Sequence, residues 1–253
     1  MRFRQQCCGG FNTKGIDCRL IERHASRIPG LFAIETDPDG ERSFRYWRDS
    51  SAARTLFSGI GASLADLGGF DVIYLSGITL AILPPEVRVT LIDATGALQH
   101  AGKLVVFDPN HWQRIWPDPA TARASFDPMW AAVSLALPSL DERARLYPGL
   151  TPQQAIDRIA GLGPQELVLK NGTCGPMIRF GGATSQTALP AADRVVDTSG
   201  AGDSFNAAYL AARVQGDPPL NAAAAGHHRA RAAISHHGAV IPREAMPDRA
   251  DRP

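Results

Sequence analysis

The chain has 253 residues, with 26 lysine and arginine residues against 25 aspartate and glutamate residues and a formal net charge of +1. Hydrophobic residues make up 44% and charged residues 20%, a balance typical of a globular domain with a full core. Because both signs of charge are interspersed, nothing in the composition favours nucleic acid or a membrane surface as a partner. The N-terminus has no hydrophobic signal core, and the four cysteines lack C-x-x-C spacing, so a cytoplasmic protein with reduced thiols is expected.

The predicted elements alternate along the chain. Strands are expected at 72–76, 103–108, 133–137, 166–170, 174–180 and 184–188, and helices at 50–58, 85–100, 118–132, 151–161, 203–214 and 218–236. Such alternation favours an α/β fold with a mostly parallel sheet and helices on both faces, here as a single domain over 1–253. A hairpin at 31–47 interrupts the rhythm and is expected to project as a small β lid, and 247–253 should form a loose tail.

The hairpin is predicted from residues 30–48, where two runs of β-forming residues flank the turn sequence D-P-D-G at 37–40. Since side chains alternate along a strand, Tyr46 and Arg48 are expected on one face. A guanidinium fork suits a planar carboxylate, although Arg48 taken by itself is better interpreted as an exposed arginine at the edge of a hairpin.

Residues 197–205 read D-T-S-G-A-G-D-S-F and lead into an alanine-rich helix. Gly200 and Gly202 allow a tight turn and a close approach of the backbone to a ligand. The amides of 200–203 would lie unpaired at the helix N-terminus, facing an anion, with Asp203 placed to take a proton from an attacking hydroxyl. A dinucleotide fingerprint is disfavoured because Phe205 stands at its third glycine, and no Walker A tripeptide is present. A turn that merely caps a helix remains an alternative on spacing alone.

This motif resembles the C-terminal signature of the pfkB family of ribokinase-like carbohydrate kinases. The resemblance implies a ribokinase-like fold and an enzyme that transfers phosphate from ATP to a sugar, with Asp203 as the general base. It also implies that the amides of Gly200, Ala201 and Gly202 form an anion hole for the γ-phosphate.

The lid segment, residues 16–48, resembles that of the bacterial 2-keto-3-deoxygluconate kinases within this family. The resemblance implies phosphorylation of 2-keto-3-deoxygluconate to its 6-phosphate, with Tyr46 and Arg48 in contact with the acid sugar and the arginine facing its carboxylate. Pairing of two copies through the lid, to give a homo-oligomer, is a further expectation.

The stretch Lys103–Trp116, a buried-type strand followed by a polar loop, resembles the D-x-N-x-R-x-R-L-W element of the same subfamily. Ligands of α/β folds bind where parallel strands end, and the resemblance implies that Asn110 and Arg114 orient the substrate. Asp108 and Trp116 match as well. Trp112 departs from the pattern, because it stands where the first arginine of the element belongs, and this removes one cation from the substrate site.

Other segments extend the resemblance to the nucleotide. L-P-S-L-D-E at 137–142 resembles an N-x-x-E element, which implies that Glu142 acts on Mg²⁺ through water. V-L-K-N-G-T-C-G at 168–175 resembles the strand and turn beside ATP. The nucleotide-binding residues so implied are Lys170, Gly172, Gly175, Thr198, Gly200 and Gly202.

The early strands and glycine-rich segment of typical pfkB kinases have no counterpart at the front of this sequence, which is interpreted as an N-terminally truncated member. Two alternatives to an acid-sugar kinase therefore stay open. The first is a non-catalytic remnant, which the missing strands indicate. The second is a pfkB kinase for a neutral sugar such as ribose or fructose, which Trp112 indicates.

Overall fold

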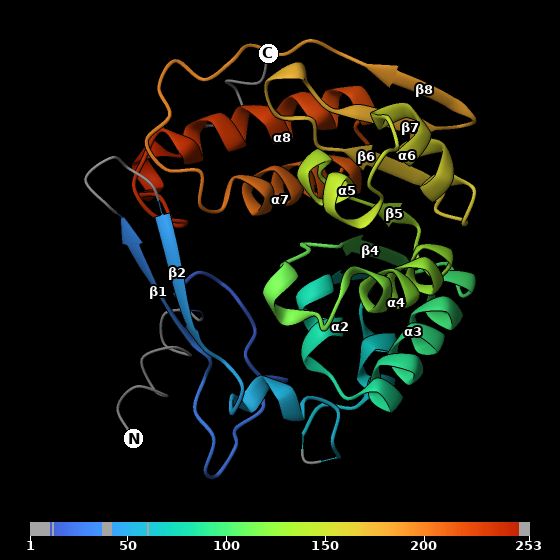
Figure 1. Cartoon of the computed structure of the whole chain (residues 1–253), viewed down its shortest axis with the longest axis vertical. Coiled ribbons are helices and arrows are strands. Elements are labelled where there is room, and N and C mark those ends of the chain that lie inside the picture. The colour runs from blue at the N-terminus through green and yellow to red at the C-terminus, as the bar shows by residue number, and fades with distance from the viewer. Residues whose placement is uncertain (1–10, 12, 37–41, 60, 248–253) are drawn as a thin grey trace.

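A six-stranded sheet forms the centre of the molecule, and its strands lie side by side in chain order (Figure 1). The computed structural model describes residues 11, 13–36, 42–59 and 61–247. The strands of this sheet are β3 (Val72–Ser76), β4 (Leu104–Asp108), β5 (Leu135–Ala136), β6 (Glu166–Leu169), β7 (Met177–Phe180) and β8 (Ala183–Gln186). Strands β3 to β6 pair in parallel and β6 to β8 antiparallel, so the prediction of a mostly parallel sheet is confirmed.

Helices cover both faces of the sheet, as the alternation predicted. One face packs against α3 (Pro85–His100), α4 (Pro119–Ala131) and α6 (Pro152–Ala160), the other against α7 (Ala201–Val214) and α8 (Pro219–Ile234). Alternate residues of β4 enter the two cores, since Phe107 lies in the first and Val106 in the second. Within the described part of the chain, no helix is both long and apolar enough to cross a membrane.

Local sequence explains where the long helices begin. Four of them, α3, α4, α6 and α8, have proline in the first turn, where the missing N–H costs nothing. Asp118 caps α4 by accepting from Thr121 N at 2.7 Å, and Thr151 forms a capping box with Gln154 at the start of α6.

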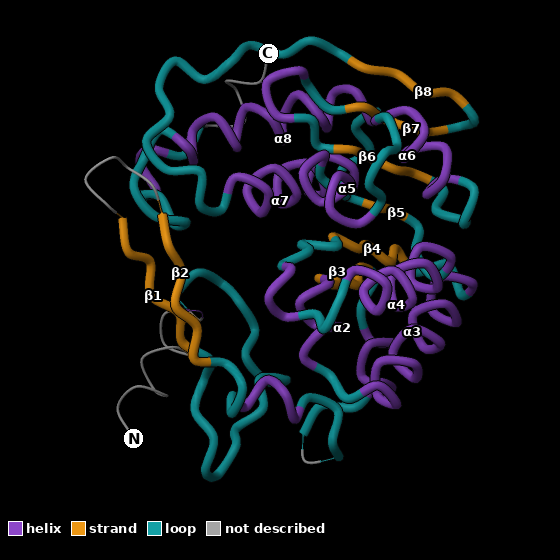
Figure 2. The backbone as a smooth tube through the Cα atoms, viewed as in Figure 1, coloured by secondary structure: helices purple, strands orange, loops and turns teal. Residues whose placement is uncertain are grey.

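The predicted lid is present as a separate two-stranded sheet of β1 (Leu31–Thr36) and β2 (Arg42–Trp47). The strands are antiparallel, with Phe32 opposite Tyr46 and Leu31 opposite Trp47. Figure 2 shows this hairpin apart from the six-stranded sheet and joined to it by loops. The turn predicted at 37–40 lies outside the described residues, as does 248–253 of the predicted tail.

Some predicted elements are wrong. The helix expected at 50–58 is a single 3-10 turn, Ala52–Thr55, because Phe57 adopts a left-handed φ of 62° that no helix tolerates. Strand β7 starts at Met177 instead of 174, since Gly172–Cys174 form a 3-10 turn and Gly175 has φ 77°. Two short helices were not predicted, α2 (Gly77–Ile82) and α5 (Leu140–Leu146).

Candidate active site

The glycine motif lies at the N-terminus of α7. Gly200 is the N-cap and is left-handed, with φ 73° and ψ 6°. A Cβ on Gly200 would also come within 3.0 Å of Ala239 O, so both the conformation and the packing require glycine here. The first i→i−4 bond of the helix runs from Ser204 N to Gly200 O at 2.8 Å, which leaves the amides of Gly202 and Asp203 ahead of it.

Two side-chain bonds hold this loop in place. Asp197 accepts from Ser199 N at 2.7 Å through Oδ1 and from Gly238 N at 2.9 Å through Oδ2, and it thereby joins the loop to the segment after α8. Inside the loop, Ala201 N donates to Thr198 O at 3.3 Å. The backbone predicted to bind the anion is thus held by bonds within the chain, one of which engages the amide of Ala201.

Asp203 stands in the first turn of α7, where it remains solvent-accessible although neighbouring atoms partly desolvate its carboxylate. This desolvation raises the pKa of Asp203 above its ordinary value, the charge of Asp108 raises it further, and Lys170 lowers it. A carboxylate with a raised pKa is a stronger base, which suits the predicted role.

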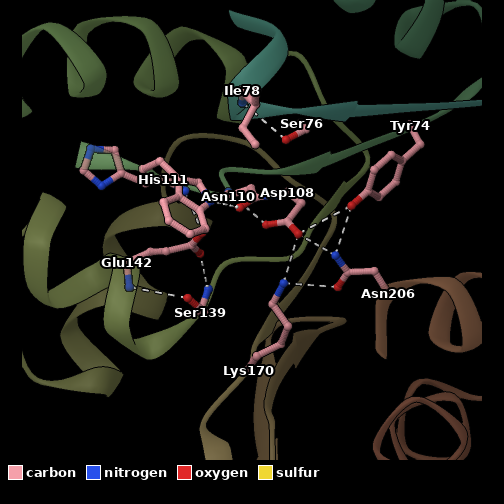
Figure 3. A network of polar contacts seen from close by, with 11 residues as sticks. Tyr74, Ser76, Ile78, Asp108, Asn110, His111, Ser139, Glu142, Lys170 and Asn206 are labelled. Atoms are coloured by element: carbon pink, nitrogen blue, oxygen red, sulfur yellow. Dashed lines mark hydrogen bonds and ion pairs between the residues drawn. The ribbon is translucent and has the colours of Figure 1, made fainter. Parts of the chain in front are cut away.

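A buried polar network lies next to this turn (Figure 3). Lys170 Nζ donates to Asp108 Oδ2 at 3.1 Å and to Asn206 Oδ1 at 3.2 Å. Asn206 Nδ2 in turn donates to Asp108 Oδ2 at 2.5 Å and to Tyr74 OH at 3.0 Å. A Cβ on Gly202 would lie 3.7 Å from Lys170 Nζ, so the ammonium is adjacent to the glycine turn. Side chains from β3, β4, α7 and the residue after β6 therefore meet beside the turn at which phosphate binding is predicted.

Sequence reasoning predicted Lys170 but missed Tyr74 and Asn206, and it did not assign a role to Asp108. A signal existed for Asn206, which follows Asp203 by three residues and shares its helix face. The strand pattern gave no signal for Tyr74, because the environment of its side of β3 becomes clear only once the helices are placed.

The turn predicted beside the nucleotide is also well ordered by packing. Gly172 and Gly175 have φ values of 50° and 77°, and a Cβ on Gly175 would lie 2.0 Å from Thr187 O. Gln186 Nε2 donates to Cys174 O at 2.9 Å, which ties this turn to β8.

Glu142 is buried at the start of α5, and each carboxylate oxygen accepts a backbone N–H. Oε1 takes His111 N at 2.8 Å and Oε2 takes Ser139 N at 2.7 Å. Burial and the charge of Asp108 raise the pKa of Glu142, while Lys170 lowers it. No group of three or more histidine, cysteine or acidic side chains able to hold a metal occurs in the part of the chain that the structure describes. Because both oxygens of Glu142 already accept backbone N–H groups, its action on magnesium through water stays a prediction.

The lid and the loop after β4 meet through aromatic rings. Tyr46 contacts Trp112 edge-on, with centroids 5.9 Å apart, and Arg48 stacks over Tyr46 at 4.5 Å and over Phe32 at 5.3 Å. Burial raises the pKa of Tyr46, while the positive charges of Arg48 and Arg114 lower it. The structure thus brings the predicted substrate residues of the lid and the loop together.

Asn110 completes this group and connects it to the buried network. Its backbone N donates to Asp108 Oδ1 at 3.0 Å, and its side-chain Oδ1 accepts from Trp112 Nε1 at 2.9 Å. Trp116, which also matched the family element, is 5% exposed and packs in the core.

A helix N-terminus with a carboxylate, an adjacent ammonium group and a lid that carries an arginine are the features expected of a ribokinase-like α/β kinase. The chain belongs to the pfkB family of carbohydrate kinases, whose description matches residues 3–246. It is 37% identical over 251 residues to the 2-dehydro-3-deoxygluconokinase of Dickeya dadantii, covering 97% of this chain and 81% of that protein. That name is a synonym of 2-keto-3-deoxygluconate kinase.

Solved structures agree on the fold. A PfkB protein from Polaromonas superposes with a TM-score of 0.79 at 22% identity, covering 91% of this chain and 75% of that one. A putative ribokinase II from E. coli, in complex with ATP and Mg²⁺, superposes with a TM-score of 0.66 at 23% identity, covering 79% of this chain and 63% of that one. The chain is therefore a sugar kinase of ribokinase-like fold.

Proposed function

We propose that the chain uses ATP to phosphorylate 2-keto-3-deoxygluconate on its terminal hydroxyl, giving the 6-phosphate. The proposal is supported by the 37% identity to 2-dehydro-3-deoxygluconokinase and by the arginine of the lid, Arg48, stacked on Tyr46 next to Trp112. The observation that carries it is the juxtaposition of Asp203, the unpaired amides of α7 and Lys170.

In this reaction Asp203 accepts the proton of the substrate hydroxyl. The freed oxygen forms a bond to the γ-phosphorus of ATP, and the bond from that phosphorus to the bridging oxygen breaks to release ADP. The predicted anion hole of Gly200, Ala201 and Gly202, extended by the amide of Asp203 at the start of the helix, is proposed to stabilise the charge that develops on the transferred group. ATP supplies the phosphoryl group, and the residues proposed to hold the nucleotide are Lys170, Gly172, Gly175 and Thr198. Mg²⁺ is proposed to be held through water near Glu142.

On the substrate side, Tyr46 and Arg48 of the lid and Asn110 and Arg114 of the loop orient the acid sugar. Arg48 and Arg114 offer planar donor groups that match a carboxylate.

The outer face of the lid exposes Leu31 and Trp47, whose exposed fractions are 56% and 57%, and we propose that copies of the chain pair there. A cytoplasmic location stays a prediction.

The test is ADP release that depends on both ATP and 2-keto-3-deoxygluconate, compared between the wild type and Asp203→Asn. The variant is expected to fold normally and to lose at least about 1000-fold in kcat, because the amide cannot accept the proton. Retained turnover in this variant would remove Asp203 from the role of base. A folded wild type that phosphorylates fructose or ribose instead would establish the neutral-sugar alternative raised by Trp112, and one that turns over no sugar would establish the non-catalytic remnant.

A further inference from the structure

Trp112 makes two directed contacts, one within the loop after β4 and one from this loop to the lid. Its indole Nε1 donates to Asn110 Oδ1 at 2.9 Å, and its ring meets Tyr46 edge-on at 5.9 Å. Trp112 is 37% exposed, so it lies at the surface of this contact and not in the core. The residue that departs from the family pattern therefore contacts both of the segments predicted to face the substrate.

The hydrogen bond from Trp112 determines which way the amide of Asn110 is turned. An indole N–H is a donor only, so the atom facing it must be the amide oxygen. The main chain of Asn110 is held as well, because its N donates to Asp108 Oδ1 at 3.0 Å and its φ of 34° lies in the left-handed region that asparagine tolerates. The bond turns Oδ1 towards the indole and so fixes the Nδ2 donors on the other side of the amide, although Oδ1 keeps a second lone pair.

We propose that Trp112 is a specificity-determining positioning residue, which locks Asn110 as an N–H donor and so selects sugars that carry a carboxylate. This inference rests on the proposed function and assigns a residue that selects the acid sugar at the same site. The charged groups facing Tyr46 from the lid and the loop are Arg48 and Arg114, which also donate and cannot accept.

The chemistry of the ligand follows from this set of donors. A carboxylate only accepts hydrogen bonds, so it can satisfy every one of these groups, whereas a sugar hydroxyl must place its own proton on an acceptor. An asparagine free to flip would serve both ligands, and one locked by Trp112 favours the carboxylate. Trp112 thereby offsets the missing arginine by fixing a neutral donor instead of adding a cation.

The experiment compares Trp112→Phe with Trp47→Phe by calorimetric binding of 2-keto-3-deoxygluconate and of ATP. Trp112→Phe keeps an aromatic ring against Tyr46 but removes the N–H, and Trp47→Phe removes an indole N–H from the outer face of the same lid. We expect Trp112→Phe to weaken binding of the acid sugar about tenfold, with the Kd for ATP changed by less than about twofold. Trp47→Phe should change neither.

A second variant keeps the inference testable if Trp112→Phe fails to fold. In Asn110→Asp the carboxylate still accepts from Trp112 but presents no donor, so acid-sugar binding should weaken by about tenfold or more while ATP binding holds. Acid-sugar binding within about twofold of wild type in either folded variant overturns the inference. A wild type that binds the acid sugar without turning it over contradicts the proposed function alone, and one that does not bind it contradicts both.

Discussion

Replacing Lys170 by methionine removes the ammonium from the buried network while keeping a side chain of similar length. Lys170 and Asp108 are paired at 3.1 Å, and their side chains are 14% and 4% exposed. Breaking one partner of a buried ion pair costs about 3–5 kcal/mol, because the other charge stays buried without compensation. Asp108 keeps its bonds from Asn206 Nδ2 at 2.5 Å and Asn110 N at 3.0 Å, so a loss near the lower limit, about 3 kcal/mol, is expected.

This loss is measured by urea denaturation followed by tryptophan fluorescence and by circular dichroism, and as a fall in Tm of about 6–12 °C. The double variant Lys170→Met/Asp108→Asn removes the stranded charge together with its partner. It should therefore be destabilised by at least about 1 kcal/mol less than the sum of the two single changes.

Arg213→Met is the matched control, because it breaks a second buried pair that is remote from the glycine turn. Arg213 contacts Glu166 at 2.6 Å, at the start of β6, whereas Lys170 follows the end of that strand. A comparable loss of stability is expected, with no effect on the ionisation of Asp203. The reasoning is refuted if Lys170→Met costs less than about 1 kcal/mol, or if the double variant shows no coupling.

Two further predictions concern ionisation. Asp203 must be deprotonated to act as the base, so the acidic limb of the pH profile of kcat/KM should follow its pKa. Lys170 lowers this pKa and Asp108 raises it, so the limb should move to higher pH in Lys170→Met and to lower pH in Asp108→Asn. It should not move in Arg213→Met. His111→Phe should raise the free energy of unfolding by about 1 kcal/mol, since both ring nitrogens of the buried His111 lack a hydrogen-bond partner among the described residues. Burial, aided by the charge of Arg145, lowers the pKa of His111, so the wild type loses stability as the pH falls below about 6.5. The stability gained in His111→Phe should therefore increase at low pH. A gain that is equal at about pH 5.5 and pH 7.5 would contradict this.

The sequence was informative where a local rule is sufficient. Gly200 must be glycine because of its own backbone conformation and its contact with Ala239, so the N-terminus of α7 could be recognised from a short motif. The long helices were predicted within one or two residues because proline and capping residues mark their starts. The false helix at 50–58 shows the limit, because its composition is compatible with a helix and only tertiary packing places Phe57 in the left-handed region.

The polar network could not be predicted for a related reason. Tyr74, Asp108 and Asn206 are separated by 34 and 98 residues along the chain, and they meet only because β3 and β4 are neighbours and α7 lies across them. A pairing of this kind depends on strand order, which periodicity does not report. The predicted residues Lys170 and Asp203 were assigned to separate ligands, whereas the structure makes them electrostatic neighbours.

Asp108 joins the two sides of the proposed reaction. Its Oδ1 holds the backbone of Asn110, on the side of the sugar, and its Oδ2 holds Lys170 and Asn206, on the side of the phosphate. We therefore expect a shift of the loop at Asn110 to affect the ammonium next to the glycine turn through this carboxylate. Because the same side chain also raises the pKa of Asp203, we expect a substitution at Asp108 to alter the proposed sugar binding, the proposed phosphate binding and the strength of the base together.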